Sequence, residues 1–163
     1  MDIQFLKKVS LVKELSGTEL NIFAAKLKTE KYREGDHLIK EDQESDKLFI
    51  LYKGKINISK KMSLIDEQQQ IDKTFITLSS GDHAFFGEIG LLGLHKRTAT
   101  CIAKTDCTLF TIVHKDFLSV CKTNPEIGFK ILLEISRKLS QLLEKTNEDV
   151  LKLTTALIYA LKS

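Results

Sequence analysis

Glu88 and Arg97 lie nine residues apart in the stretch FGEIGLLGLHKRTAT, residues 86–100, most of which is small or apolar. Gly87 and Gly90 flank the glutamate, and glycine allows a sharp turn and a close approach of a ligand to the backbone. If a short helical turn begins here, its free N–H groups favour an anion, above all a phosphate. A guanidinium would add a planar pair of donors to the same phosphate.

Glu88 cannot bind a phosphate, because both groups are anions. Its carboxylate suits a pair of hydroxyl groups, from which it can accept hydrogen bonds. Phosphate donors beside a hydroxyl acceptor describe a site for a ribose phosphate. The spacing alone leaves a second interpretation open, in which Glu88 and Arg97 form a surface ion pair worth about 0–1 kcal/mol.

The same stretch resembles the phosphate-binding cassette of cyclic nucleotide-binding domains, the family of catabolite activators, kinase regulatory subunits and cyclic-nucleotide-gated channels. The family pattern is Phe-Gly-Glu, an aliphatic residue, a small residue, two aliphatic residues, a short loop, then Arg, two small residues and Thr. The matching residues are Phe86, Gly87, Glu88, Ile89, Gly90, Leu91, Leu92, Arg97, Thr98, Ala99 and Thr100. The resemblance extends over residues 5 to about 145, through LFILYKGKINIS, SSGDHAFFGE and TDCTLFTIVHKDFLSVCKTNPEI.

The resemblance implies a ligand and a role for each residue of the cassette. Arg97 would pair with the exocyclic phosphate oxygens of cAMP or cGMP, and Glu88 would accept from the ribose 2′-hydroxyl. Backbone N–H groups near Gly87, Ile89 and Gly90 would hold the phosphate. In the family, Thr at position 98 is associated with guanine in the syn form; alternatively, Thr98 contacts the phosphate or simply suits a strand. The implied ligand-binding set is Phe86, Gly87, Glu88, Ile89, Gly90, Arg97 and Thr98.

Four residues depart from the family pattern without removing a ligand group. Asp42 and Ser45 stand in a turn where glycine is frequent, and Asp tolerates a left-handed backbone better than most residues. Gly90 replaces the more usual alanine, and Lys96 stands where proline is common.

The elements that must position the cassette follow from the hydrophobic periodicity. Ser16 and Glu19 have capping-box spacing and predict a helix over about residues 18–28. From 30 to 113, short apolar runs alternate with turn residues, which predicts an antiparallel sandwich or barrel. With the resemblance, the expected fold is mainly β: an eight-stranded antiparallel, jelly-roll-like β-roll with flanking helices. Residues 60–73 are polar and predict a protruding hairpin or loop.

The chain after residue 113 is expected to be helical. HKDFLSVCKT predicts one short helix, and Asn124 as N-cap with Pro125 at the first position opens a second. Thr146 and Asp149 could form another capping box, so one continuous helix and a broken helix both fit. We expect residues 1–124 to form the cyclic nucleotide-binding β-roll with its N-terminal and first closing helices.

Residues 125–163 are expected to form a C-terminal lid and dimerisation helix. Its apolar residues recur at alternating spacings of four and three, like a coiled-coil seam. An apolar tail is unfavourable in water, so a homodimer through this helix is predicted. The seam consists of Leu139, Leu143, Thr146, Val150, Leu153 and Leu157.

Composition narrows the function classes. The chain has 163 residues, 42% hydrophobic and 29% charged, which is globular. A net charge of +3 without a basic cluster argues against DNA, as do the 16 residues after Asn147, too few for a helix-turn-helix domain. We expect no signal peptide and no membrane segment. Three cysteines without CxxC spacing predict free thiols in a cytoplasmic protein.

No spacing of histidines or cysteines indicates a metal site, and no nucleophile signature indicates an enzyme. The expected function is therefore a cyclic nucleotide sensor, in which ligand-dependent movement of the C-terminal helices is recognised by an unknown effector protein. The alternative is a structural dimerisation module that keeps the fold without the ligand.

Overall fold

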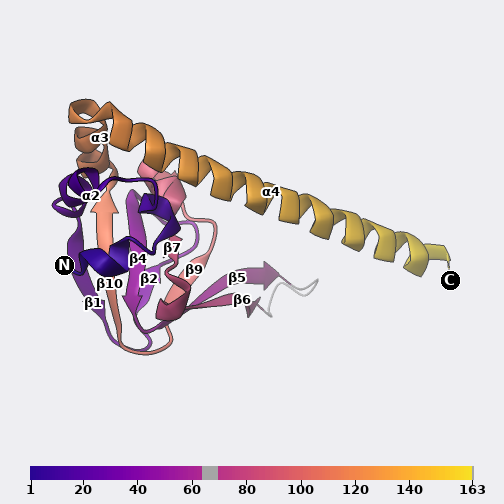
Figure 1. The fold of residues 1–163 in the computed structure, drawn as a ribbon. Helices are drawn as coiled ribbons and strands as arrows, with labels where there is room; N and C mark the ends of the chain where they lie inside the picture. The colour runs from indigo at the N-terminus through magenta and orange to yellow at the C-terminus, as the bar shows by residue number, and fades with distance from the viewer. Residues whose placement is uncertain (64–69, 163) are drawn as a thin grey trace.

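A computed structural model describes residues 1–63 and 70–162 as a β-roll flanked by helices, with one long helix projecting from it (Figure 1). The helices are α1 (Ile3–Leu6), η1 (Ser10–Val12), α2 (Gly17–Ala24), η2 (Ser80–Asp82), η3 (Glu88–Leu92), α3 (His114–Thr123) and α4 (Pro125–Lys162). The strands are β1 (Lys28–Tyr32), β2 (His37–Ile39), β3 (Glu44–Ser45), β4 (Lys47–Lys53), β5 (Lys55–Ser63), β6 (Gln70–Ser79), β7 (Phe85–Phe86), β8 (His95–Lys96), β9 (Thr100–Ala103) and β10 (Cys107–Val113).

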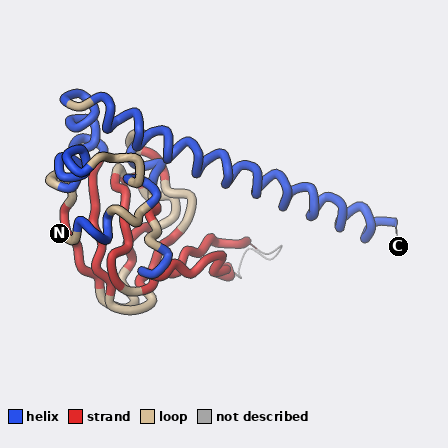
Figure 2. The backbone as a smooth tube through the Cα atoms, viewed as in Figure 1, coloured by secondary structure: helices blue, strands red, loops and turns tan. Residues whose placement is uncertain are grey.

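The strands form two four-stranded antiparallel sheets and a short ribbon. One sheet has the order β1-β10-β4-β7, the other has the order β2-β9-β5-β6, and β3 pairs with β8. The helices gather over one side of the roll, while the β5–β6 hairpin extends away from it (Figure 2). The predicted β-roll with flanking helices is confirmed.

Strand alternation divides the apolar residues between two cores. On β4, Leu48 and Ile50 face the helices, whereas Phe49 and Leu51 face the space between the sheets. Neighbouring strands divide in the same way, with Phe85 of β7 in the helical core and Phe86 in the inter-sheet core. The ring of Phe86 stacks on that of Phe49, with centroids 5.3 Å apart. Period-two burial therefore fixes the register of the strand that leads into the cassette.

The N-terminal helix prediction is confirmed at its start and wrong at its end. Ser16 and Glu19 form the capping box, but α2 stops at Ala24 instead of residue 28. The chain tightens there into a turn, in which Leu27 N donates to Ala24 O. The early stop has a structural reason, because Lys28 already pairs with Thr111 of β10.

The C-terminal predictions are resolved in favour of one continuous helix. HKDFLSVCKT forms α3 as predicted, and α4 runs unbroken from Pro125 to Lys162. The Thr146 hydroxyl donates to the Leu142 carbonyl one turn earlier, so it lies inside the helix and does not cap a new one. The protruding hairpin predicted over residues 60–73 is formed by β5 and β6, and its tip, residues 64–69, lies outside the described residues.

Candidate functional site

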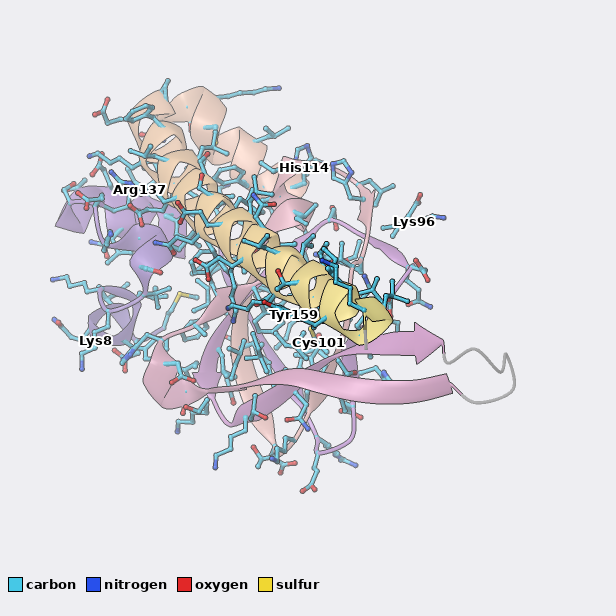
Figure 3. All side chains as sticks on the ribbon, turned by 90° about the vertical axis from the view of Figure 1, so that its right-hand side faces the viewer. Lys8, Lys96, Cys101, His114, Arg137 and Tyr159 are labelled. Atoms are coloured by element: carbon cyan, nitrogen blue, oxygen red, sulfur yellow. The ribbon has the colours of Figure 1, made fainter. Side chains whose placement is uncertain are left out.

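A cavity of about 470 Å³ opens beside η3, between the β-roll and α4. All seven residues of the predicted ligand-binding set line it: Phe86, Gly87, Glu88, Ile89, Gly90, Arg97 and Thr98. Figure 3 views the molecule with the free end of α4, marked by Tyr159, projecting toward the reader. Residues that are distant in sequence thus converge on one concave site.

Two glycines shape the turn that carries Glu88. Gly87 has φ +74°, a left-handed conformation that favours glycine, and the 3-10 helix η3 begins at the next residue. At Gly90, a Cβ atom would lie 2.8 Å from the Lys47 carbonyl oxygen, so the close approach of η3 to β4 requires a glycine. The Gly90 N–H donates to the Gly87 carbonyl at 3.0 Å, so this donor is engaged within the turn instead of being free for an anion.

Arg97 is buried and held by the elements around it. Its Nη1 donates to the Gly87 carbonyl at 3.0 Å, and its Nη2 donates to Ser45 Oγ at 2.8 Å and to the Lys47 carbonyl at 2.5 Å. Asp42 takes a left-handed backbone (φ +64°) and its N–H donates to the Arg97 carbonyl, as the turn prediction requires. Burial lowers the pKa of the Arg97 guanidinium, but an arginine remains charged at neutral pH.

One donor of this guanidinium has no partner. Among the residues that the structure describes, Nε of Arg97 is the one buried side-chain nitrogen or oxygen that makes no hydrogen bond. Leaving a buried donor unpaired costs about 1–3 kcal/mol. Arg97, which lines the cavity, therefore keeps one donor that the described residues leave unpaired.

Glu88 is also buried, at 7% exposure, and faces a residue that the sequence did not point to. Its Oε2 lies 3.2 Å from Nζ of Lys138, which comes from α4. The same ammonium group donates to the Phe85 carbonyl at 2.7 Å and lies over the Phe85 ring. The alternative interpretation, a surface ion pair between Glu88 and Arg97, is therefore wrong, because both side chains are buried and the glutamate pairs with Lys138.

The wall of the cavity is largely apolar. Ile58, Ile76 and Leu78 come from the β5–β6 hairpin, and Leu142 comes from α4. Lys138 and Leu142 are one helical turn apart, so the spacing of α4 could have indicated a face directed at the site. Cys101 also lines the cavity, and burial raises the pKa of its thiol to about 12, so it is protonated at neutral pH.

The position of η3 is fixed from outside the cavity as well. His114, the first residue of α3, has its Nδ1 2.6 Å from the Leu91 carbonyl oxygen. Leu91 itself is buried in the helical core, so the cassette turn is tied to the closing helices by both packing and a polar contact. Among the described helices, none has the length and apolar content that a membrane span requires.

A two-sheet roll closed by helices, with a cavity against its cassette turn, indicates the class of the protein. The sequence model of one protein family, the cyclic nucleotide-binding domain, matches residues 29–124, more than half of the chain. The chain belongs to the cyclic nucleotide-binding domain family. The family resemblance of the cassette is thereby confirmed.

Relatives with known names share this part of the chain. The chain is 32% identical over 112 residues to human cGMP-dependent protein kinase 2, and the matched region covers 69% of this chain and 14% of the kinase. It is 29% identical over 121 residues to the cAMP-activated global transcriptional regulator CRP of Salmonella typhimurium, covering 74% of this chain and 52% of that protein. The chain thus corresponds to only part of each relative.

Solved structures share the fold. The N-terminal domain of a transcriptional regulator from Streptomyces coelicolor superposes with a TM-score of 0.73 at 21% identity, covering 87% of this chain and 94% of that one. A cyclic nucleotide-binding domain from Methylobacillus flagellatus superposes with a TM-score of 0.74 at 17% identity, covering 91% of this chain and 80% of that one. At this identity the likeness concerns the fold alone.

Proposed function

We propose that this protein binds a 3′,5′-cyclic nucleotide in the cavity beside η3 and acts as a non-catalytic sensor. The observation that carries the proposal is the buried Arg97, which lines the cavity and has an Nε donor without a hydrogen bond. A phosphodiester oxygen would satisfy this donor with a charge-assisted hydrogen bond. The cavity volume of about 470 Å³ lies within the range of small-molecule sites.

Glu88 would hold the ribose in this arrangement. Glu88 lines the same cavity. Its carboxylate has several lone pairs, so it can accept a hydrogen bond from a hydroxyl and still accept one from Lys138. The apolar side chains of the β5–β6 hairpin and Leu142 offer a surface for a base. Phosphate, sugar and base would each meet a matching part of the wall.

Both cAMP and cGMP fit this chemistry, and we favour cGMP. Thr98 lines the cavity and is exposed, so its hydroxyl is accessible to a guanine in the syn form. Several relatives at 30–33% identity carry the name cGMP-dependent protein kinase. The named relatives also include a cAMP-activated regulator, so both ligands belong in the test.

The signal would leave the site through α4, because Lys138 and Leu142 contribute to the cavity. In this proposal residues 1–124 bind the ligand, and residues 125–163 act as the lid and dimerisation helix recognised by an effector protein. Leu143, Val150, Leu153 and Leu157 of the predicted seam are 56–71% exposed, which favours a second copy of this chain as the partner of α4. Three free thiols, two of them buried, are consistent with a cytoplasmic location.

Calorimetric titration of cAMP and cGMP into the wild-type protein and Arg97→Ala tests the proposed function. The wild type should bind at least one nucleotide, and removing the charged phosphate partner should cost about 2–5 kcal/mol. Arg33→Ala removes an exposed guanidinium outside the cavity and should bind like the wild type. If the wild type binds neither nucleotide yet sediments as a dimer, the structural dimerisation module is the correct function.

A further inference from the structure

The charge of the site does not balance without α4. Glu88 and Arg97, the two buried charged side chains of the cavity wall, cancel each other, so a phosphodiester anion bound at Arg97 would add an unbalanced negative charge to the buried part of this half-open cavity. Burying a charge without compensation is strongly unfavourable. Asp82 and Lys96 at the rim are exposed, opposite in sign and screened by solvent.

Lys138 supplies the missing positive charge from another element. Its ammonium is 3.2 Å from Glu88 Oε2, and its side chain is 28% exposed, so it is partly withdrawn from solvent. The Phe85 carbonyl and ring fix its position from the other side. With Lys138 in place, the three side chains carry one net positive charge, which one phosphodiester neutralises.

Lys138 is also the last of three polar attachments that follow one face of α4. Lys130 pairs with Glu19 of α2 at 2.8 Å, and Glu134 one turn later pairs with Lys13 at 3.3 Å. Lys138, a further turn along, is the attachment that reaches the cavity. From residue 140 to 162 every residue is exposed, so the Lys138 contact lies where the helix leaves the roll.

We infer that Lys138 is the second cation of the anion site and couples ligand binding to the docking of residues 136–142 of α4. This inference rests on the proposed function and adds the residue that carries the signal. A bound anion increases the attraction on the ammonium and so favours the docked helix. Because coupling is reciprocal, a docked Lys138 raises the affinity for the anion by the same factor.

The test compares Lys138→Met, which keeps the length and loses the charge, with Lys138→Arg and with Lys130→Met. Lys130→Met makes the same change two turns earlier, in a pair outside the cavity. Calorimetry with cAMP and cGMP should show binding weakened about tenfold or more in Lys138→Met. Lys138→Arg should stay within about threefold of the wild type, because it keeps the charge. Lys130→Met should bind like the wild type.

Hydrogen exchange of residues 136–142 gives a second readout. The nucleotide should slow exchange there in the wild type and in Lys130→Met, and leave it unchanged in Lys138→Met. Wild-type affinity and wild-type protection in Lys138→Met would overturn the inference while nucleotide binding stands. Absence of binding to the wild type would instead overturn the proposed function, and this inference with it.

Discussion

The guanidinium of Arg97 is oriented before any ligand arrives. Ser45 and the carbonyls of Lys47 and Gly87 engage its two terminal nitrogens, which fixes the plane of the group. A donor held in place loses little conformational freedom on binding, so its interaction contributes more to affinity. Gly90 makes the arrangement possible, because a Cβ there would lie 2.8 Å from Nη2 of Arg97.

Thr98 provides the residue-scale prediction. Replacing it with alanine should weaken cGMP binding by roughly two- to tenfold, since one neutral hydrogen bond contributes about 0.5–1.5 kcal/mol. The affinity for cAMP should stay unchanged if the hydroxyl contacts the guanine. Competition titrations against one fluorescent nucleotide measure both affinities, and equal losses would assign Thr98 to the phosphate instead.

At the scale of elements, α4 is anchored to the N-terminal helices independently of the cavity. Ile127, Ile131 and Ile135 are buried in the helical core, and Lys130 donates to both carboxylate oxygens of Glu19. The hydrogen bond from Lys130 is the largest cause that lowers the pKa of Glu19 to about 2. The same carboxylate closes the capping box of α2, so one side chain joins two helices.

This pair predicts a pH dependence of stability. A carboxylate with a lowered pKa stabilises the fold fully above its unfolded pKa, here about 4.5, and this stabilisation is lost as the pH falls toward about 2. In Lys130→Met the pKa of Glu19 should rise toward its ordinary value, so stability should fall less steeply between about pH 4.5 and 2 than in the wild type. Urea unfolding at several pH values measures the slope.

Lys152→Met is the matched control for this pH dependence. Lys152 pairs with Glu148 and Asp149 on the exposed part of α4. The stability of Lys152→Met should therefore fall with decreasing pH as steeply as that of the wild type. A wild-type slope in Lys130→Met as well would mean that the Glu19 pair does not contribute to acid stability.

At the scale of the whole molecule, the exposed half of α4 is the feature that the β-roll does not explain. It projects beyond the roll (Figure 1), and its apolar side chains are exposed. A large exposed apolar surface marks an interaction site. The regular spacing of four and three along the predicted seam fits a second identical helix better than an irregular surface.

Charge placed in this seam should separate the copies. Val150→Asp combined with Leu153→Asp should weaken self-association by roughly two orders of magnitude, because the interface would bury unpaired carboxylates. Leu151→Asp makes the same kind of change at an exposed leucine outside the seam and should remain a dimer. Sedimentation velocity distinguishes the species. A monomeric wild type, or equal dissociation by all the variants, would contradict the seam.

The cassette and the fold could be predicted from the sequence, whereas the contact between the cassette and α4 could not. FGEIGLL and the following arginine match a local family pattern, and this resemblance, added to the spacing, predicted that Glu88 and Arg97 share one cavity. The partner of Glu88 depends on how α4 crosses the roll, a long-range property that periodicity does not contain. The sequence therefore does not indicate Lys138, and α2 ends earlier than its helical spacing predicts because pairing of β1 with β10 overrides that spacing.

The contact between Glu88 and the sugar can be isolated by a cycle that removes each partner in turn. Calorimetry would compare the tighter-binding cyclic nucleotide with its 2′-deoxy analogue, on the wild type and on Glu88→Ala. Loss of the hydroxyl should cost the wild type about 1.5–3 kcal/mol, as expected for a hydrogen bond to a charged group, and should cost Glu88→Ala almost nothing. Equal losses in the two proteins would contradict the account, because the ribose would then lie elsewhere.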